Sequence, residues 1–363
     1  MSESMKAFIV TRNAPGKDFI GGAELQAWLI TKYLRKDYGW ETLYVALEGE
    51  TVGKETRDDA EFCYLSSKGE EFWRSFRRFS ELIREEKPDL CYIRDFRYLF
   101  PLAVVAWMRG IPVVYNTTHE KNLYFYCGWQ GVKGTLLHAL SFIALHFVTV
   151  ITNNESHAKN LATRGIKATA IMNSIEDNYR EGIAKKKRVV WVANLKPRKR
   201  PELFIELAGR FRGSGYEFVM IGHLQADTAR YLRLIDEEST YNPNFRYMGG
   251  LSLHEVDEIL AESEIFVSTC KPEGFPNNII QACFAKCVIV SFNYDPDGVL
   301  RRYAAGYVPK TFDSMVEVIQ NLMAGNADKE MAERARAYAL EHHSIRRNMA
   351  RFNDVFQNIA ASR

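Results

Sequence analysis

The sequence lacks an excess of charge of either sign, since 48 Lys plus Arg stand against 45 Asp plus Glu, a formal net charge of +3. Bases and acids are interspersed, which argues against a dedicated nucleic-acid binder. The first residues, MSESMKAFIVTR, have no basic segment followed by an apolar core, so no secretory leader is expected and a cytoplasmic protein is favoured. A hydrophobic share of 47% excludes a disordered chain and is enough for a packed core.

Cysteine pairs with metal-binding spacing are also missing. The 6 cysteines include no CxxC pair, so we expect free thiols in a reducing compartment. Cys283 and Cys287 would share one face of a helix, where two buried small side chains are favoured over a metal or redox site.

One uncharged run, residues 134–154, approaches the length of a membrane-spanning helix. Its character changes midway, from apolar residues at helical spacing to the β-branched run 148–151. The pattern therefore predicts a buried helix that runs into a strand rather than a membrane span. The helical positions are Leu136, Leu140, Ile143 and Phe147.

Short β-rich runs alternate with longer amphipathic runs, the pattern of parallel sheets with crossover helices. Between two such series, residues 173–188 are polar, with a basic run and no hydrophobic period, which indicates a linker. The strands expected before the linker are 6–11, 42–47, 89–94, 111–116, 148–152 and 168–172. Those expected after it are 189–193, 217–221, 245–248, 265–268, 288–291 and 306–308.

Helix signals support this division. Pro201 suits a first helical turn, and Ser252 with Glu255 has capping-box spacing, as Ser314 has with Glu317. The chain ends in an apolar stripe typical of a long helix, formed by Ile345, Met349, Phe352, Phe356 and Ile359.

These patterns predict an α/β protein of two Rossmann-like domains, 1–180 and 181–340, facing each other across a cleft, with a C-terminal helix at 341–363. Folds of this kind bind ligands at the carboxyl ends of their strands. After the first strand the chain reads RNAPGKDFIGGAE and lacks GxGxxG, so a Rossmann dehydrogenase is not favoured.

The most informative segment is STCKPEGFPNNIIQACFAKCVIVS, residues 268–291, in which a strand ends, a turn follows and a helix opens near Asn277. Backbone N–H groups at a helix N-terminus bind anions such as a diphosphate, and Gly274 allows close backbone approach. Glu273 precedes this turn, where its carboxylate can accept hydrogen bonds from sugar hydroxyls. Gln281 lies one helical turn further along.

PEGFPNNIIQA, with GGAE early, NTTH in the middle and VANLKPRKRPE after the linker, resembles the retaining GT-B glycosyltransferases of glycosyltransferase family 4. The resemblance covers essentially the whole chain. It implies that 1–180 binds the acceptor, that 181–340 binds a nucleotide-sugar donor, and that 341–363 packs back on the N-terminal domain.

The resemblance also implies residue roles in the donor domain. Glu273 matches the Glu that contacts the donor sugar, and Gln281 stands where the family has a second Glu, usually its ribose contact. Asn194 stands where the family has an Arg, while the family's Lys is kept as Lys199, which is expected to stabilise the diphosphate. The residues whose backbone is expected to line the sugar and diphosphate are Gly274, Phe275, Pro276 and Asn277. The residues open as replacements for the missing Arg are Lys196, Arg198 and Arg200.

One further difference from the family, and several matches to it in the N-terminal half, complete the expected site. Lys286 stands where the family has a small residue, which puts the local packing in question. Gly21 and Gly22 resemble glycines that pass close to the donor diphosphate. His119 matches the family's active-site His beside the donor sugar, with Glu120 next to it.

The resemblance implies transfer of a sugar from a nucleoside diphosphate, UDP rather than GDP, to a hydroxyl of a glycan or lipid-linked saccharide in cell-surface polysaccharide biosynthesis. It implies retention at the anomeric carbon, with no bound metal and no other cofactor. Peripheral contact with the inner face of a membrane is a further hypothesis, through 72–79 or 124–134, whereas nucleic acid is not an expected partner. Two alternatives stay open: a catalytically decayed GT-B protein that binds glycan or nucleotide, and a GT-B-type sugar-nucleotide epimerase or hydrolase.

Overall fold

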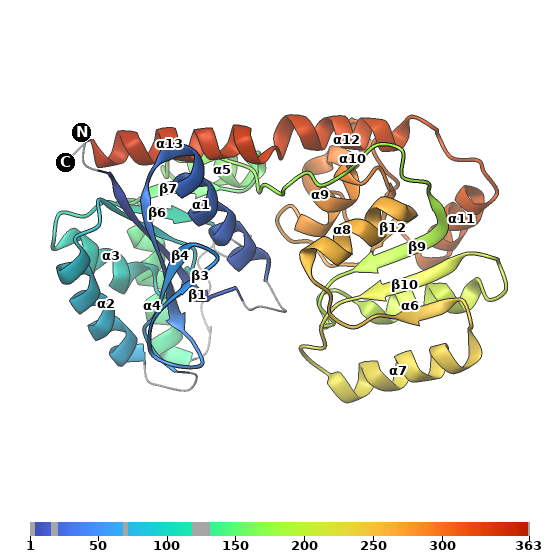
Figure 1. The fold of residues 1–363 in the computed structure, drawn as a ribbon, viewed down its shortest axis with the longest axis horizontal. Helices are drawn as coiled ribbons and strands as arrows, with labels where there is room; N and C mark the ends of the chain where they lie inside the picture. Colours follow the sequence, from blue (N-terminus) through green and yellow to red (C-terminus); the bar gives the residue numbers. More distant parts are fainter. Residues whose placement is uncertain (1–3, 16–20, 68–71, 118–130, 362–363) are drawn as a thin grey trace. The chain divides into compact units, whose positions relative to one another are not determined.

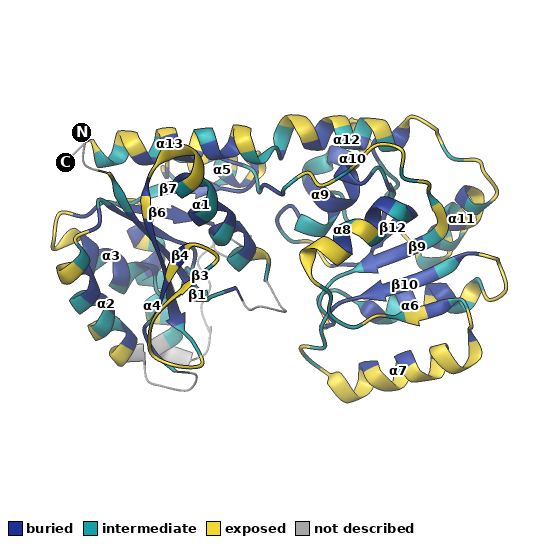
Figure 2. Cartoon of the chain, viewed as in Figure 1, coloured by how far each residue is buried: buried dark blue, intermediate teal, exposed yellow. Residues whose placement is uncertain are grey.

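The computed structural model describes residues 4–15, 21–67, 72–117 and 131–361. The chain forms two compact units, and each is described by itself (Figure 1). Of the described residues, the first unit holds those up to Ser174 and those from Ile345 onward, and the second holds Ile175–Ser344. In both units the central strands of the sheet are buried, while the edge strand β3 (Gly53–Arg57) and the outward sides of the helices are exposed (Figure 2).

The first unit is built on one sheet with strand order β3-β4-β2-β1-β5-β6-β7-β8. Its pairs are parallel except for β3 and β4. Helices join the parallel strands, as crossover connections require. The strands are β1 (Lys6–Asn13), β2 (Glu41–Glu48), β3 (Gly53–Arg57), β4 (Ala60–Tyr64), β5 (Leu90–Ile93), β6 (Val113–Asn116), β7 (Thr149–Thr152) and β8 (Ala168–Ala170). The helices are α1 (Gly22–Tyr38), α2 (Phe72–Glu86), α3 (Leu99–Trp107), α4 (Gly131–Ala144), α5 (Glu155–Ala162) and the C-terminal α13 (Ile345–Ala360).

Alternation along β1 divides the core of this unit between the two faces of the sheet. Phe8 and Val10 belong to one cluster, with residues of α2, α3 and α5, while Ala7 and Ile9 belong to the other. Successive side chains of a strand point to opposite faces, and both faces of a parallel sheet are covered. The second cluster contains α1 and the apolar stripe of α13, so the last helix packs on the sheet of the first unit.

The second unit has a parallel sheet of order β11-β10-β9-β12-β13. Helices α6, α7 and α11 contribute to the core on one face, and α8, α9 and α12 pack against one another. The strands are β9 (Lys186–Val192), β10 (Glu217–Ile221), β11 (Phe245–Tyr247), β12 (Ser263–Ser268) and β13 (Val288–Ser291). The helical segments are α6 (Pro201–Arg210), α7 (Thr228–Tyr241), α8 (Leu253–Glu262), α9 (Asn277–Phe284), η2 (Pro296–Gly298), α10 (Val299–Arg302), α11 (Phe312–Met323) and α12 (Met331–His342).

The helix-start predictions hold in two places and fail in one. Pro201 is the first residue of α6, and Ser252 caps α8 in a capping box with Glu255. The expected cap at Ser314 is wrong: Thr311 caps α11, and Ser314 is its partner three residues on. A threonine side chain also accepts the N3 amide, so the helix begins one turn earlier than the Ser–Glu pattern indicates.

Three strand predictions need correction. The hairpin of β3 and β4 was missed, because β3 is exposed and charged and its turn residues, Asp58 and Asp59, both have positive φ, as a tight two-residue hairpin turn requires. The expected strand 306–308 is a single bridge between Tyr307 and Val290. The basic end of the predicted linker belongs to β9, where Lys186 and Arg188 pair with acidic residues of the same unit.

The uncharged run 134–154 forms helix α4 followed by strand β7, as predicted, but the predicted buried face is wrong. Leu136, Ile143 and Phe147 are 59%, 50% and 84% exposed. The helix packs instead through His138, which contacts Phe96, and through Ser141, whose hydroxyl accepts the Phe100 amide. Over the described ranges, no helix is both long enough and apolar enough to cross a membrane.

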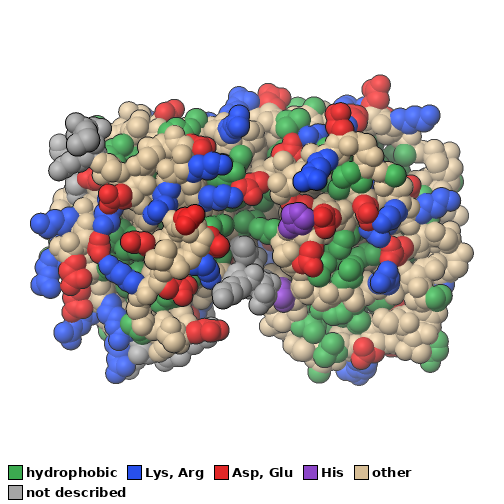
Figure 3. Space-filling model, viewed as in Figure 1, with side chains coloured by type: hydrophobic (Ala, Val, Ile, Leu, Met, Phe, Trp, Pro, Cys, Tyr) green, Lys and Arg blue, Asp and Glu red, His purple; other side chains and the backbone are tan. Residues whose placement is uncertain are grey.

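The distribution of surface charge and the state of the cysteines match what the sequence predicts. Lys, Arg, Asp and Glu side chains are interspersed on the face seen in Figure 3. The described cysteines, 63, 91, 270, 283 and 287, are buried and free. Cys283 and Cys287 are small core residues, and burial raises the pKa of both thiols, that of Cys287 to about 11.

Candidate active site

Two loops at the carboxyl ends of neighbouring strands form the centre of the candidate site. The 193–200 loop follows β9, and the 269–276 loop follows β12, its neighbour in the sheet. Thr269 joins them: its hydroxyl accepts a hydrogen bond from the Trp191 indole N–H at 2.9 Å and donates to the carbonyl of Lys199 at 2.7 Å. Parallel pairing of β9 with β12 thus brings together segments about 75 residues apart in sequence.

Glu273 and Lys199 meet in this centre. The Lys199 ammonium donates to Glu273 Oε1, and the Arg198 Nε lies 3.6 Å from Oε2. The side chains of Lys199 and Glu273 are only 14% and 15% exposed. Burial alone would raise the pKa of the Glu273 carboxyl, but the charges of Lys199 and Arg198 outweigh it and hold the pKa below its usual range. The carboxylate is therefore ionised at neutral pH.

Arg200 has a structural task instead. Its guanidinium donates to the carbonyls of Thr269 at 2.5 Å, Cys270 at 3.2 Å and Phe292 at 3.3 Å, and stacks 4.8 Å from the centre of the Phe292 ring. Arg198 donates to the Pro272 carbonyl in addition to its contact with Glu273. Of the residues considered as replacements for the absent arginine, Arg200 thus holds the 269–276 loop and Arg198 faces the carboxylate.

Helix α9 starts directly after the 269–276 loop. Its N-cap is Pro276, which supplies no side-chain hydrogen bond to the helix. Phe275 is 3% exposed and contacts His343 with the two rings tilted and their centres 4.5 Å apart, while Asn278 donates to the Val192 carbonyl at the end of β9. The start of the helix is thus fixed against the sheet, and its first residue, Asn277, follows Glu273 by four positions at the end of the same loop.

Gln281 lies one turn into α9 and is 7% exposed. Its Nε2 donates to Asp257 Oδ1 on α8 at 2.9 Å.

Asn194 lies in the 193–200 loop, directly after β9. Gly222 packs against the start of this loop, where a Cβ on Gly222 would lie 1.7 Å from the Ala193 carbonyl oxygen. Only glycine therefore fits at position 222.

Two family models match the chain, one over each part of it. Residues 175–342 match the family described as Glycosyl transferases group 1, and residues 20–179 match the one described as Glycosyltransferase Family 4. Together the two matches run from residue 20 to residue 342. The chain is a GT-B glycosyltransferase that resembles family 4.

Solved structures show the same fold at low sequence identity. Anabaena Alr3699/HepE in complex with UDP-glucose aligns with a TM-score of 0.75 and 16% identity, over 98% of this chain and 100% of that one. Sucrose-phosphate synthase (tll1590) from Thermosynechococcus elongatus gives 0.80 and 12%, over 99% and 100%. The lipopolysaccharide outer core galactosyltransferase WaaB gives 0.66 and 13%, over 98% and 100%. Among proteins with curated descriptions, none matches the sequence significantly.

The remaining site predictions for this glycosyltransferase concern the first unit. Gly21 is the N-cap of α1 and Gly22 its first residue; a Cβ on Gly21 would lie 2.2 Å from the Glu24 carboxylate. His119 and Glu120 lie outside the described residues. Lys199, Glu273 and the start of α9 thus form one cluster in the second unit, while the two glycines belong to the first.

The structure shows how Lys286 is accommodated at a position where the family has a small residue. It has a positive φ of 56° just after α9, and its ammonium pairs with Glu333 at 2.7 Å and lies 5.4 Å from the centre of the Tyr179 ring. The long side chain therefore points away from the helix core and packs on the start of the second unit. The described residues contain no group of three or more His, Cys, Asp and Glu placed to hold a metal.

Tyr294 is a site residue that sequence reasoning missed. Its hydroxyl, close to the Glu273 and Gly274 carbonyls, donates to the latter at 2.8 Å and fixes the peptides on either side of the turn. Burial raises the pKa of this phenol, so it stays protonated and remains a donor. No local sequence signal marks it, because it follows a different strand, β13.

The paired charges predict how donor binding varies with pH. Since the pKa of Glu273 is lowered, its pairing stabilises the fold above the usual Glu pKa of about 4.3 and is lost as pH falls through the lower, folded-state value. We expect the affinity ratio of nucleotide sugar to the methyl ester of the nucleoside diphosphate, neither of which takes up a proton in this range, to stay constant from about pH 7.5 to pH 5. In Lys199→Met, the effect of burial is opposed only by the weaker contributions of Arg198 and Cys270, so the carboxyl pKa rises and the ratio falls on approaching pH 5.

Calorimetric titrations across this range measure the ratio. The matched control is Lys186→Met, which removes a lysine paired with Glu262 and leaves the two loops intact. A wild-type ratio that already declines between pH 7.5 and pH 6 would show that the carboxyl pKa is raised rather than lowered.

Proposed function

We propose that this glycosyltransferase moves a sugar from a UDP-sugar to a hydroxyl of a glycan or lipid-linked saccharide in cell-surface polysaccharide biosynthesis, with retention and without a bound metal. The observation that carries the proposal is the pairing of Glu273 with Lys199 beside the N-terminus of α9. A carboxylate accepts hydrogen bonds from sugar hydroxyls, while an ammonium group and helix amides bind a diphosphate. Together these groups suit a nucleotide-sugar donor.

The proposed reaction breaks the bond between the anomeric carbon and the β-phosphate oxygen and forms a bond to the acceptor oxygen. Lys199 and the α9 amides stabilise the charge that develops on the departing diphosphate. Glu273 accepts hydrogen bonds from the sugar hydroxyls and holds the anomeric carbon in position. The acceptor's proton passes to the departing phosphate oxygen, so no side chain is assigned as general base.

The choice of donor and acceptor is supported by the similar structures. Alr3699/HepE was solved with UDP-glucose and also with UDP and glucose, and WaaB is named for galactosyl transfer to the lipopolysaccharide outer core. The UDP-glucose complex of Alr3699/HepE shares the fold of this chain at 16% sequence identity, and WaaB shares it at 13%. UDP is accordingly the nucleotide of the proposal, and a surface saccharide its acceptor class.

Calorimetric titration of the wild-type protein tests the donor. UDP, GDP and a panel of their sugar conjugates are added without metal and again with Mg²⁺. The proposal expects one UDP-sugar to bind more tightly than UDP itself and Mg²⁺ to add nothing. Binding of GDP conjugates only, or binding that needs the metal, would contradict the corresponding part of the proposal. A transfer assay that follows the anomeric configuration of the product tests retention.

The proposal includes contact of the first unit with an anionic membrane. Residues 124–130 of one segment expected to make this contact, 124–134, lie outside the described residues, and the surface proposed here is formed by other residues. Helices α3 and α4 pack together, and they leave Ile143 50%, Phe147 84% and Trp107 79% exposed. Exposed apolar residues near basic side chains suit a membrane interface. Arg109 follows α3 directly and donates to Ser80 on α2, which brings a positive charge to this surface.

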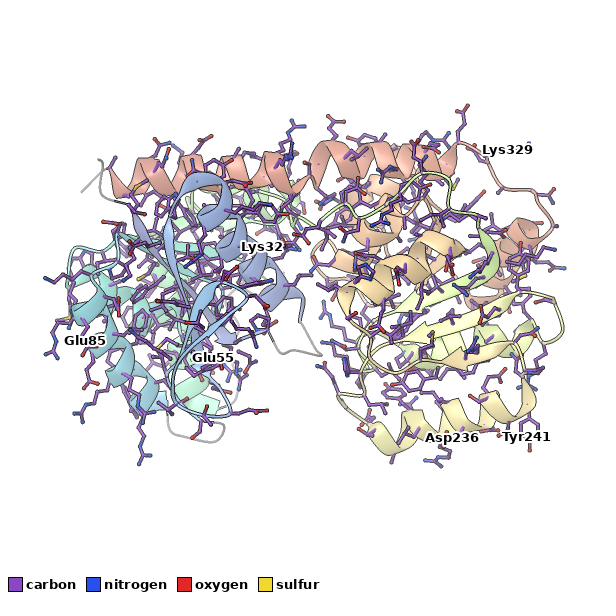
Figure 4. The ribbon with its side chains drawn as sticks, viewed as in Figure 1. Lys32, Glu55, Glu85, Asp236, Tyr241 and Lys329 are labelled. Atoms are coloured by element: carbon purple, nitrogen blue, oxygen red, sulfur yellow. The ribbon has the colours of Figure 1, made fainter. Side chains whose placement is uncertain are left out.

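Sedimentation with vesicles tests that contact. We expect the wild-type protein to co-sediment with anionic vesicles at low salt, and the double variant Ile143→Ser, Phe147→Ser to bind them several-fold more weakly. Tyr241→Ser is the control, since Tyr241 is 68% exposed on α7 of the second unit (Figure 4). Failure of the wild-type protein to sediment would end this part of the proposal and leave the donor chemistry untouched.

A further inference from the structure

Asp257 on α8 lies beside the candidate donor site without belonging to either loop. Its Oδ1 accepts from Gln281 Nε2 at 2.9 Å, and its Oδ2 accepts from Asn178 Nδ2 at 2.8 Å. The three side chains come from the start of the second unit, from α8 and from α9, so the contact exists only in the folded chain.

The carboxylate of Asp257 keeps capacity for further hydrogen bonds. An ionised carboxylate has about four acceptor positions, and the two amides occupy one on each oxygen. Burial raises the pKa of Asp257, and the hydrogen bonds from the two amides oppose this. Glu176 raises the pKa further and His254 lowers it. The N–H groups of Gln281 and Asn178 thus support the negative charge of Asp257.

The position of Asp257 relative to α9 suits a ribose. Residue 281 is four positions beyond residue 277, so Gln281 lies about 6 Å along the helix from the N-terminal amides. A diphosphate bound at those amides is joined to its ribose over a comparable length. Gln281 is 7% exposed, whereas Asp257 is only partly buried, so the carboxylate is the more accessible member of the pair.

We propose that Asp257 supplies the carboxylate that accepts hydrogen bonds from the ribose hydroxyls of the donor nucleotide, with Gln281 as the residue that positions it. The inference rests on the proposed function, because it assumes a nucleotide at this site. Position 281 carries an amide where the resembling family has a carboxylate, and the adjacent helix places one 2.9 Å from that amide. Two vicinal hydroxyls donating to one carboxylate form charge-assisted hydrogen bonds.

The test compares UDP with 2′,3′-dideoxyuridine diphosphate, which keeps the base and the diphosphate but lacks both hydroxyls. We expect the wild-type protein to prefer UDP by about tenfold to a hundredfold in calorimetric titrations. Asp257→Asn should reduce this preference to within about threefold, mainly by weakening UDP and not the dideoxy nucleotide. Asp236→Asn, on the exposed side of α7, is the control and should keep the full preference (Figure 4).

A double variant separates the binding role from a merely structural one. Asp257→Asn with Gln281→Glu reverses the pair, keeps one carboxylate hydrogen-bonded to one amide, and should recover most of the preference for UDP. A loss of preference in the single variant that the double variant does not recover, or a full preference in Asp257→Asn, overturns the inference. If the wild-type protein binds neither nucleotide, the proposed function itself fails, which is a distinct result.

Discussion

Glu273→Gln is expected to lower kcat/KM for sugar transfer by about 10²- to 10³-fold, the usual cost of removing one preorganised polar group from an active site. The substitution removes the acceptor of the sugar hydroxyl bonds and leaves the Lys199 ammonium without its paired charge. Buried charges that lose their partner are costly, so the 269–276 loop is expected to lose order as well. Free UDP contacts mainly Lys199 and the α9 amides in the proposal, so its affinity should change much less than that of the UDP-sugar.

Steady-state kinetics with the best donor, together with titrations of UDP and UDP-sugar, measure this effect. Glu262→Gln is the matched control, because Glu262 also pairs with a lysine and an arginine but lies at the opposite end of β12. It should keep wild-type kinetics. A Glu273→Gln enzyme with wild-type kcat/KM, or one that loses UDP and UDP-sugar affinity equally, would contradict the assigned role.

Phe356→Ala is expected to lower the free energy of unfolding of the first unit by about 3–5 kcal/mol, the range for removing a buried phenylalanine. Phe356 is 0% exposed and lies within 6.0 Å of the Trp40 ring and 5.6 Å of the Tyr92 ring, measured between ring centres. Its helix, α13, forms part of one of the two core clusters of that unit, and the Trp40 indole N–H donates to Asn353 on the same helix. The cavity left by alanine would therefore open the contact between α13 and the sheet.

Hydrogen exchange followed by mass spectrometry locates the change. Peptides from β1, β5 and α13 should lose protection, while peptides from β9 to β13 keep it. Gln357→Ala on the exposed side of α13 is the control and should change the unfolding free energy by less than about 0.5 kcal/mol. Equal loss of protection in both units would show that α13 does not stabilise the first unit in particular.

Patterns of neighbouring residues in the sequence correctly predicted the elements that such neighbours determine by themselves. Strands β10 and β13 have the bounds that their β-branched runs predict, and α8 has the predicted capping box. The predictions failed where a neighbour in space decides the outcome. The strand β3 is exposed and charged and exists because β4 pairs with it. Helix α4 turns its apolar stripe outward because His138 packs on Phe96 and Ser141 bonds to the Phe100 amide of α3.

The candidate site divides in the same way. Glu273, Lys199 and the helix start at Asn277 were predicted from one segment and from a family resemblance, and the structure brings all three into one unit. The tasks of Arg200 and Tyr294 were not predicted, because their partners are backbone carbonyls on other loops, which carry no sequence signal.

The sequence by itself determined the alternation of strands and helices, the carboxylate before the turn and the helix N-terminus that follows it, because hydrophobic period, glycine and proline act on neighbours along the chain. Only the tertiary structure decided that Lys199 neutralises Glu273 and that Asp257 stands beside Gln281. Those contacts join residues 74 and 24 positions apart. They follow from the order in which parallel strands pair and from the packing of α8 against α9, which no local pattern contains.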